Sequence, residues 1–165
     1  RDFGGKRIWL TEYGYQTNPP DPSGVSRTVQ AQYLAEAALR AKDARFVDVL
    51  INFMIEDESR LAGWQSGLLT AAGAAKPSFN SFMLPIAQAG RTGVRTTIWG
   101  QVRTGFGKRT YRLQRLASGR WVNVGAPALT NLRGSYARIV RAAPGTRFRV
   151  LWLPSRTPSR PIVVH

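Results

Sequence analysis

Acidic side chains follow two apolar segments of this chain, and carboxylates in such positions can act as nucleophiles, acids or bases. Glu12 follows the apolar residues 8–11, and an acidic cluster at residues 56–58 follows the apolar residues 46–55. Each apolar run suits a buried parallel strand. Two parallel strands that carry carboxylates at their C-terminal ends, joined by a helix, are typical of the active-site edge of an α/β barrel.

The segments around these carboxylates follow the order strand, long loop, helix, strand, long loop, helix. A Gly- and Pro-rich loop follows the first strand, and loops of this length in compact domains are usually functional. Ser26 or Thr28 is the expected N-cap of a helix that continues to about Lys42, because Ala, Leu, Gln and Glu dominate this stretch. A short second helix is expected to start at Pro77 and to end before Pro85.

Two sets of motifs resemble a known family. Residues 8–14, IWLTEYG, resemble the seventh-strand motif of the retaining (β/α)8-barrel glycoside hydrolases, the clan that holds cellulases, xylanases and β-xylosidases. Residues 53–58, FMIEDE, with GWQSGL at 63–68 and KPSF at 76–79, resemble the eighth strand, its loop and the closing helix. The resemblance covers the first half of the chain. It implies that residues 1–89 are the last two βα units of an incomplete TIM barrel.

The resemblance implies that Glu12 is the catalytic nucleophile. Retaining hydrolysis needs one ionised carboxylate for attack and a second carboxyl group about 5 Å away as acid and base. In the clan the second group follows the fourth strand, commonly in an Asn-Glu pair, and this sequence contains no such pair. We therefore expect the isolated chain to be inactive. We also interpret its start at Arg1, without an initiator Met, as a cut through a longer parent polypeptide that holds the rest of the barrel.

Three further residues are predicted to bind the substrate, and each has an alternative role. Tyr15 and Trp64 can stack on pyranose rings, or they can cover the barrel rim. Asp57 lies at the end of the adjacent strand, about 4.8 Å away in a parallel sheet, which also makes it a weaker candidate for the acid/base. In the resembled clan that position lines the pocket or makes a structural salt bridge. Glu12 itself can instead form an ion pair or cap a helix.

The net charge of +15 is confined to the second half of the chain. All nine acidic residues precede residue 59, and residues 1–89 contain as many Lys and Arg as Asp and Glu. Residues 90–165 contain the remaining basic residues and no acidic one. So abrupt a shift predicts two domains, 1–89 and 90–165, with the seam near residues 85–93.

Short segments with the period of a β-strand fill the second half. They lie at residues 96–103, 110–116, 120–124, 135–141, 148–153 and 161–164, separated by turn residues. This pattern predicts an antiparallel β-sandwich. It resembles the immunoglobulin-like sandwiches appended to bacterial secreted and surface enzymes. Arginines alternate with apolar residues in these segments, so we expect the arginines on the solvent face. The expected fold class is thus α/β followed by all-β.

The composition excludes several other kinds of site. Cysteine is absent and the single histidine, His165, ends the sequence, which excludes thiol chemistry, histidine catalysis and Cys/His metal sites. No phosphate loop or dinucleotide fingerprint occurs, and no apolar run is long enough to span a membrane. We expect no cofactor and no metal, a carbohydrate substrate, and a secreted or cell-surface location.

The basic half leaves a second function open. A charge of +15 without an acidic residue binds any polyanion non-specifically and with strong salt dependence. The alternative function is therefore a non-catalytic binding or structural module whose residues 90–165 associate with an anionic polymer. Nucleic acid, a cell-wall polymer and an acidic polysaccharide all fit that description. An arginine-rich solvated surface without a partner is a further alternative.

Overall fold

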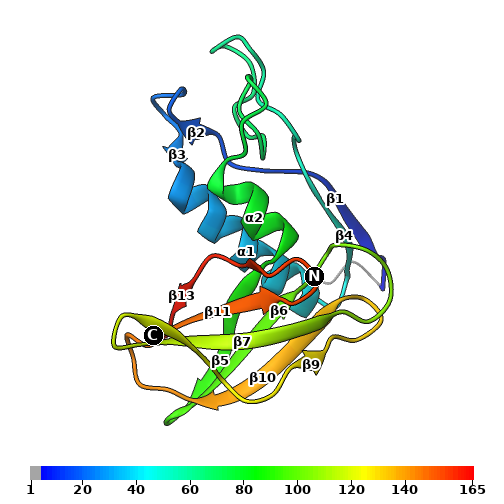
Figure 1. The fold of residues 1–165 in the computed structure, drawn as a ribbon. Helices are drawn as coiled ribbons and strands as arrows, with labels where there is room; N and C mark the ends of the chain where they lie inside the picture. Colours follow the sequence, from blue (N-terminus) through cyan, green and yellow to red (C-terminus); the bar gives the residue numbers. More distant parts are fainter. Residues whose placement is uncertain (1–4) are drawn as a thin grey trace. The chain divides into compact units, whose positions relative to one another are not determined.

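The computed structural model describes residues 5–165 and divides the chain into two compact units between Phe82 and Met83. The elements of both units follow one another from the blue to the red end of the ribbon in Figure 1. The division lies just before the predicted seam, because the first strand of the second unit, β5 at Ile86–Thr92, occupies the seam itself. No helix among the described residues is long and apolar enough to cross a bilayer.

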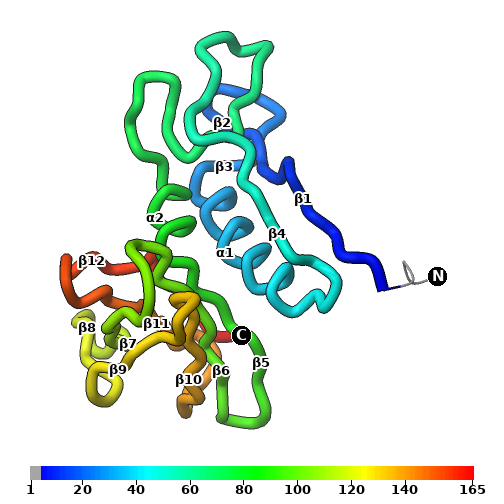
Figure 2. The backbone as a smooth tube through the Cα atoms, turned by 90° about the vertical axis from the view of Figure 1, so that its right-hand side faces the viewer, coloured from blue at the N-terminus to red at the C-terminus, as the bar shows by residue number. Residues whose placement is uncertain are grey.

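The first unit contains the predicted pair of parallel strands. β1 (Ile8–Tyr13) pairs with β4 (Val47–Asn52), and Leu10 lies opposite Leu50 and Tyr13 opposite Asn52. Figure 2 shows the two strands side by side with α1 on the β4 side. The parallel order that the sequence predicts is therefore confirmed. A sheet of two strands is not a barrel, and the TIM barrel stays a prediction.

Helix α1 (Arg27–Asp43) joins the two parallel strands, as expected. The hydroxyl of Ser26 accepts a hydrogen bond from the Val29 amide at 3.2 Å, so Ser26 is the N-cap and Thr28 lies inside the helix. The buried face of α1 is rich in alanine and leucine. It consists of Gln30, Ala31, Leu34, Ala35, Ala38 and Leu39.

Three small elements complete the first unit. β2 (Thr17–Asn18) and β3 (Val25–Ser26) pair in parallel within the loop after β1. Helix α2 (Pro77–Met83) starts with a proline and ends before Pro85, as the sequence predicts.

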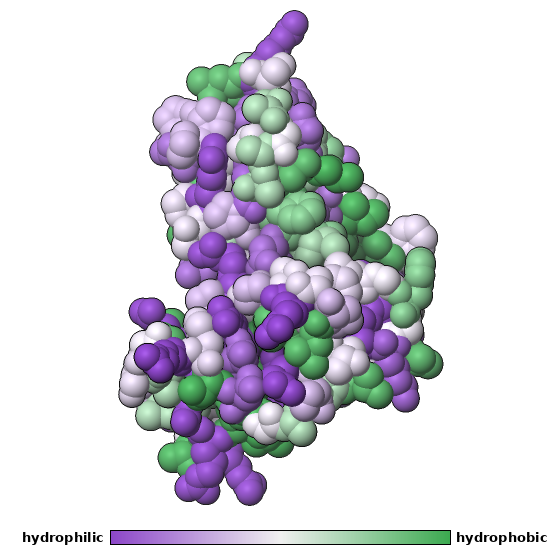
Figure 3. Space-filling model, in the orientation of Figure 1, coloured by the Kyte–Doolittle hydropathy of each residue, from purple (hydrophilic) through white to green (hydrophobic). Residues whose placement is uncertain are grey.

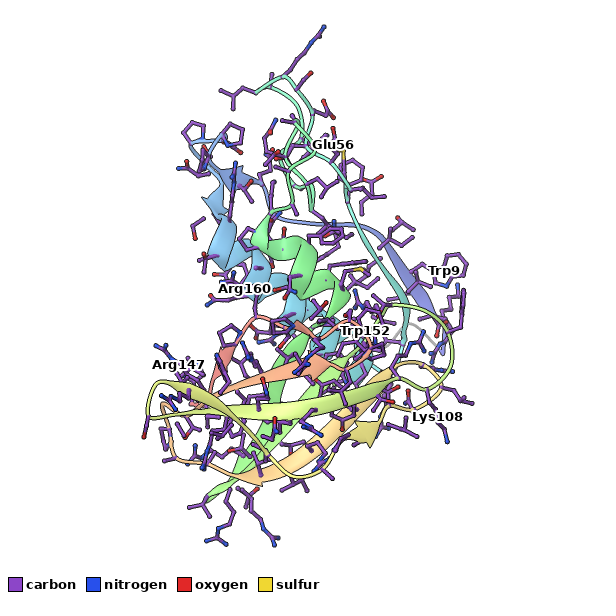
Figure 4. All side chains as sticks on the ribbon, in the orientation of Figure 1. Trp9, Glu56, Lys108, Arg147, Trp152 and Arg160 are labelled. Carbon is purple, nitrogen blue, oxygen red and sulfur yellow. The ribbon has the colours of Figure 1, made fainter. Side chains whose placement is uncertain are left out.

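The sheet of the first unit leaves one apolar face open. Trp9 of β1 is 65% exposed and Ile51 of β4 is 46% exposed. Trp9 points away from α1 in Figure 4. Parallel strands are normally buried on both faces, so the side of this sheet opposite α1 has the composition of an interior surface.

The second unit consists of two antiparallel sheets, which confirms the predicted β-rich sandwich architecture. The smaller sheet has the order β10 (Ser135–Arg141), β6 (Arg95–Gln101), β5. The larger has the order β12 (Thr157–Pro158), β11 (Arg147–Trp152), β7 (Thr110–Ala117), β8 (Arg120–Asn123), with β13 (Ile162–Val163) beside β11 and β9 (Ala128–Leu129) beside β7. The immunoglobulin-like topology stays a prediction.

Side chains from both sheets form the core of the second unit. Tyr111 of the larger sheet stacks on Tyr136 of the smaller one, with ring centroids 4.3 Å apart. The other fully buried members are aliphatic or aromatic: Leu84, Ile86, Ile98, Val102, Leu113, Phe148, Val150 and Val164. The central strands of the larger sheet contribute alternate residues to this core, Tyr111 and Leu113 from β7 and Phe148 and Val150 from β11, as the period-two segments in the sequence predict.

Close packing of backbone against Tyr136 makes Gly100 a sensitive position. A Cβ at Gly100 would lie 2.5 Å from the Pro85 carbonyl oxygen and would overlap the Tyr136 hydroxyl. Gly100→Ala should therefore lower the free energy of unfolding of the second unit by about 1–3 kcal/mol, measured by urea unfolding followed by near-ultraviolet circular dichroism. Gly90→Ala is the matched control, because nothing lies within 4 Å of a Cβ there. Equal effects of the two substitutions would contradict this account of the packing.

Candidate functional site

The C-terminal ends of β1 and β4 meet at one edge of the parallel sheet. The Phe53 amide, just after β4, donates to the Tyr13 carbonyl oxygen at 2.8 Å. Gly14 packs so closely on the Phe53 carbonyl that a Cβ would overlap it, and that Cβ would also lie 3.1 Å from the Ser66 Cβ. Glu12 directly precedes this junction. The edge that the sequence predicts as the active-site edge is thus a defined, tightly packed feature.

Glu12 offers an exposed carboxylate at this edge. It is the second-to-last residue of β1, just before Tyr13, and it is exposed. Among residues 5–165 its carboxylate has neither a hydrogen bond nor an ion pair. The alternative roles for Glu12, an ion pair or a helix cap, are therefore not formed within the part of the chain that the structure describes.

Asp57 lies in a buried ion pair. Its Oδ1 accepts a hydrogen bond from Lys76 Nζ at 2.7 Å, and the two side chains are 2% and 0% exposed. The same oxygen accepts the Gly67 amide at 2.8 Å. Burial lowers the pKa of the Lys76 ammonium, and the Asp57 carboxylate acts in the opposite direction. Of the two roles that the resemblance implies for this position, the structure favours the structural salt bridge over contact with substrate.

The Lys76 ammonium connects three segments of the first unit. Besides Asp57, it donates to Thr17 Oγ1 at 2.8 Å and to the Gln65 carbonyl oxygen at 3.0 Å. Thr17 belongs to the loop after β1, Gln65 and Asp57 to the loop after β4, and Lys76 to the entry of α2. An ammonium has three donors, and all three are used. This network fixes both loops that border the strand ends.

Gln30 of α1 strengthens the same junction. Its Nε2 lies 3.0 Å from the Tyr15 carbonyl oxygen and 3.2 Å from that of Ser66, and its residue is fully buried. Neither the role of Gln30 nor the burial of Lys76 can be predicted from the sequence, because both are polar residues whose partners are distant along the chain.

Tyr15 lies in a tyrosine cluster beside α1. Its hydroxyl accepts from Tyr13 Oη at 2.9 Å, and its ring lies 4.9 Å from the ring of Tyr33. Burial and this hydrogen bond raise the pKa of Tyr13. The three tyrosines line an open groove of about 430 Å³ between β1 and α1, whose other lining residues are Leu10, Glu36, Ala37, Arg40, Ala41, Ala44, Val47 and Leu50. Glu12 does not line this groove.

Trp64 lies in the loop after β4 and is 53% exposed. Its ring packs edge-on against Phe53, with centroids 5.8 Å apart, and its carbonyl oxygen accepts the Glu58 amide at 3.0 Å. Phe53 is the residue that bonds to the end of β1, so Trp64 belongs to the same edge as Glu12. Glu56, labelled in Figure 4, is exposed in the same loop after β4. The structure therefore groups Trp64 with the strand ends and places the Tyr15 ring against Tyr13 and Tyr33.

Acidic residues at this edge do not form a metal-binding group. No cluster of three or more His, Asp or Glu side chains that could hold a metal ion occurs within residues 5–165. The absence of a cofactor stays a prediction.

Comparisons with known proteins give only a distant structural likeness. Neither a protein-family model nor a curated protein matches the sequence. Among solved structures, the chain is similar to Bacteroides uniformis beta-glucuronidase 2 covalently bound to cyclophellitol-6-carboxylate aziridine, with a TM-score of 0.39 and 11% identity over 94% of this chain. It is similar to a calcium-binding mutant of the same enzyme with a TM-score of 0.39 and 12% identity over 94% of this chain. The chain spans 22% and 21% of those two chains. A likeness at this level carries no argument about function.

Removal of one partner of the buried ion pair should unfold the strand-end junction. Lys76→Met leaves the Asp57 carboxylate buried without a cation, so the free energy of unfolding should fall by about 3–5 kcal/mol. The measurement is urea unfolding followed by the helical circular-dichroism signal, which reports α1. Lys42→Met is the matched control, because Lys42 pairs with Asp43 on the surface, and its cost should be below about 1 kcal/mol.

A second substitution separates the unpaired charge from the packing. Asp57→Leu combined with Lys76→Met removes both charges and should be more stable than Lys76→Met alone. A double variant that is less stable than the single one would show that the buried charge is not the cause.

Proposed function

We propose that the first unit is the C-terminal part of the barrel of a retaining glycoside hydrolase, with Glu12 as the nucleophile. The observation that carries the proposal is the exposed Glu12 carboxylate, without a partner among the described residues, beside the junction of two parallel strand ends. Active sites of α/β barrels are built at the C-terminal ends of their strands. The motif resemblance around Glu12 and around residues 53–58 supports the same assignment.

The chemistry proceeds in two displacements in this proposal. The Glu12 carboxylate attacks the anomeric carbon and forms a glycosyl ester, while a second carboxyl group donates a proton to the departing glycosidic oxygen. Water then attacks the same carbon, its proton passes to the second carboxylate, and Glu12 leaves as a free carboxylate. A carboxylate that already has a fixed cation would be a weaker nucleophile. Glu12 has no such partner within residues 5–165.

Other residues of the strand-end edge take supporting roles. Trp64 is the proposed sugar platform, because its ring is half exposed and is held in place by Phe53. Asp57 and Lys76 position the two loops and do not contact substrate. Tyr15 holds the chain after Glu12 against α1 through its contacts with Tyr13 and Tyr33, a positioning role in place of the predicted stacking role.

Further parallel strands complete the sheet in this proposal. They would pair with the open edges of β1 and β4 and cover Trp9 and Ile51, and one of them would supply the acid/base. The sugar, the linkage and a secreted or cell-surface location belong to the parent enzyme and are not fixed by these residues.

The isolated chain should have no glycosidase activity. It supplies a nucleophile without the second carboxyl group, so incubation with a panel of aryl glycosides should release no more phenol than a buffer blank. Turnover by the isolated chain that Glu12→Gln abolishes would contradict the proposed division of the active site.

The coding sequence upstream of Arg1 tests the proposal itself. It should encode six further βα units, with an Asn-Glu pair after the fourth strand. The longer polypeptide should then cleave glycosides with retention of configuration, and Glu12→Gln should reduce kcat by roughly 10⁴-fold or more, because a nucleophile and its partner act as a unit. A fluorinated mechanism-based glycoside should label the peptide that contains Glu12.

Asp43→Asn is the matched control for the longer polypeptide, because Asp43 is an exposed carboxylate at the end of α1 that pairs with Lys42. It should keep full activity. An upstream sequence without such units, or label on another peptide, would overturn the assignment of Glu12.

A further inference from the structure

The larger sheet of the second unit has a polar outer face. Residues that lie opposite each other in antiparallel strands share a face, and the pairs Leu113–Val150 and Tyr111–Trp152 lie on the core side. The intervening residues lie on the other side of the sheet. This side also carries Leu116 and Leu151. We call it the arginine face and define it by its polar and aromatic residues Arg112, Gln114, Trp121, Asn123, Arg147 and Arg149.

The centre of the arginine face is an ordered network. The Arg149 guanidinium lies 4.4 Å from the centroid of the Trp121 ring, a cation–π contact. Arg149 Nε donates to Gln114 Oε1 at 2.9 Å, and Gln114 Nε2 donates to Asn123 Oδ1 at 3.0 Å. Partial burial lowers the pKa of Arg149, but the group stays fully charged at neutral pH. The guanidinium is thus held in one orientation before any ligand arrives.

The network leaves donors of both half-buried arginines without acceptors. Within residues 5–165 the terminal nitrogens of Arg149 make no hydrogen bond, since only its Nε is used. Arg112 Nε on the neighbouring strand is buried and also has no partner there. A buried donor without an acceptor is costly. The Arg112 Nε lies out of reach of a ligand, so the terminal nitrogens of Arg112 and Arg149, which make no hydrogen bond within residues 5–165, are the donors that an acidic ligand can meet.

The charge of the second unit strengthens this argument. Residues 83–165 contain no acidic side chain, so no carboxylate side chain of this unit can neutralise the arginine face. In Figure 3 strongly hydrophilic residues are interspersed with hydrophobic ones over this unit. The face therefore combines a concentrated positive potential with aromatic and amide groups.

A pocket adjoins one end of the arginine face. It has a volume of about 430 Å³ and is lined by Arg115, Leu116, Ala117, Gly145, Thr146 and Arg147. Arg147, labelled in Figure 4, is the first residue of β11 and precedes Arg149 by two positions. Cations thus follow one another along the strand from the pocket to the central network, in an arrangement suited to a linear ligand.

We propose that the arginine face binds an acidic polysaccharide whose carboxylates pair with Arg112, Arg147 and Arg149. The guanidinium fork matches a carboxylate in bidentate geometry, and the side-chain amides of Gln114 and Asn123 suit sugar hydroxyls. The choice of a polysaccharide also rests on the proposed glycoside hydrolase function, since the polymer held by the second unit would then be the one that the barrel cuts.

Nucleic acid fits the arginine face less well. Sequence-independent binding of single strands uses open aromatic rings as stacking platforms, whereas Arg149 already covers the ring of Trp121. Recognition of a duplex through its major groove needs a helix or a two-stranded ribbon that enters the groove. The arginine face is a sheet surface, and every element after α2 in the second unit is a strand.

The test measures binding of the 165-residue chain to polygalacturonate by titration calorimetry at low and at moderate salt. A neutral galactan and a DNA oligonucleotide of similar length serve as comparison ligands. Polygalacturonate should bind more tightly than DNA at each salt concentration, and the neutral galactan should not bind. Arg149→Ala and Arg112→Ala should each weaken polygalacturonate binding about 10-fold, as expected for loss of a charge-assisted hydrogen bond.

Two matched variants separate a defined face from diffuse charge. Arg95→Ala and Arg141→Ala each remove one positive charge from the smaller sheet, where the two exposed residues lie opposite each other on β6 and β10. Each should weaken binding less than about 2-fold. Arg149→Lys keeps the charge but loses the fork, so it should weaken binding nearly as much as Arg149→Ala. It also preserves a cation over Trp121, so its effect does not depend on whether the alanine variant folds.

Several results would overturn the proposal. Equal losses of polygalacturonate affinity in all four alanine variants would show that the attraction is diffuse. Full binding by Arg149→Lys would show that the guanidinium fork is not used. Tighter binding of DNA than of polygalacturonate would assign the face to nucleic acid. Asp43→Asn, an exposed position of the first unit outside the proposed active site, should leave polygalacturonate affinity unchanged. Failure of binding therefore refutes the arginine face alone, whereas failure of the Glu12 experiments refutes the proposed hydrolase alone.

Discussion

The buried pair of Lys76 and Asp57 is the interaction on which the strand-end edge depends. Two charges removed from water are stable only when their mutual attraction and additional hydrogen bonds offset the lost hydration. Here the ammonium fills all three of its donor positions, and the carboxylate oxygen also accepts the Gly67 amide. Because these partners come from the loop after β1, the loop after β4 and the start of α2, none of the three segments can shift without leaving a buried group unpaired. Through Thr17 the network holds the segment that follows β1, the strand that carries Glu12.

Local signals in the sequence predict most of the helices and strands, whereas the remaining elements depend on pairing between strands. The cap at Ser26 and the alanine-rich stretch after it predict α1, and the strand–helix–strand order predicts that β1 and β4 run parallel. The charge shift predicts a seam at residues 85–93, where the structure has β5, whose residues IAQAGRT include small and polar types with weak strand preference. It is a strand because its backbone pairs with β6 along most of its length. Likewise, the sequence shows Asp57 as one of three consecutive acidic residues, and only the fold shows that it alone of them is buried.

The arginines of the second unit show the same limit of sequence patterns. Alternation with apolar residues correctly places Arg112 and Arg149 on the side of the sheet opposite the core. It does not show that both are half-buried, because that depends on which residues the neighbouring strands bring beside them. The register sets Gln114 opposite both Arg149 and Asn123, and brings Trp121 within range of the guanidinium. Strand register is a tertiary property, so an ordered network and a plain solvated surface look identical in the sequence.

In the proposed barrel the open face of this parallel sheet is an interior surface, whereas in a remnant that has lost its function it faces solvent. A two-stranded parallel sheet is unstable alone and is normally covered on both faces. A remnant adapted to an existence without further strands would be expected to replace exposed apolar residues on the open side with polar ones, because exposed apolar surface promotes association. Trp9 and Ile51 are instead large and exposed, as they would be if the interior of a barrel faced them. The Glu12 carboxylate near the end of β1 is exposed and has no hydrogen bond or ion pair within residues 5–165, which is compatible with the proposed nucleophile.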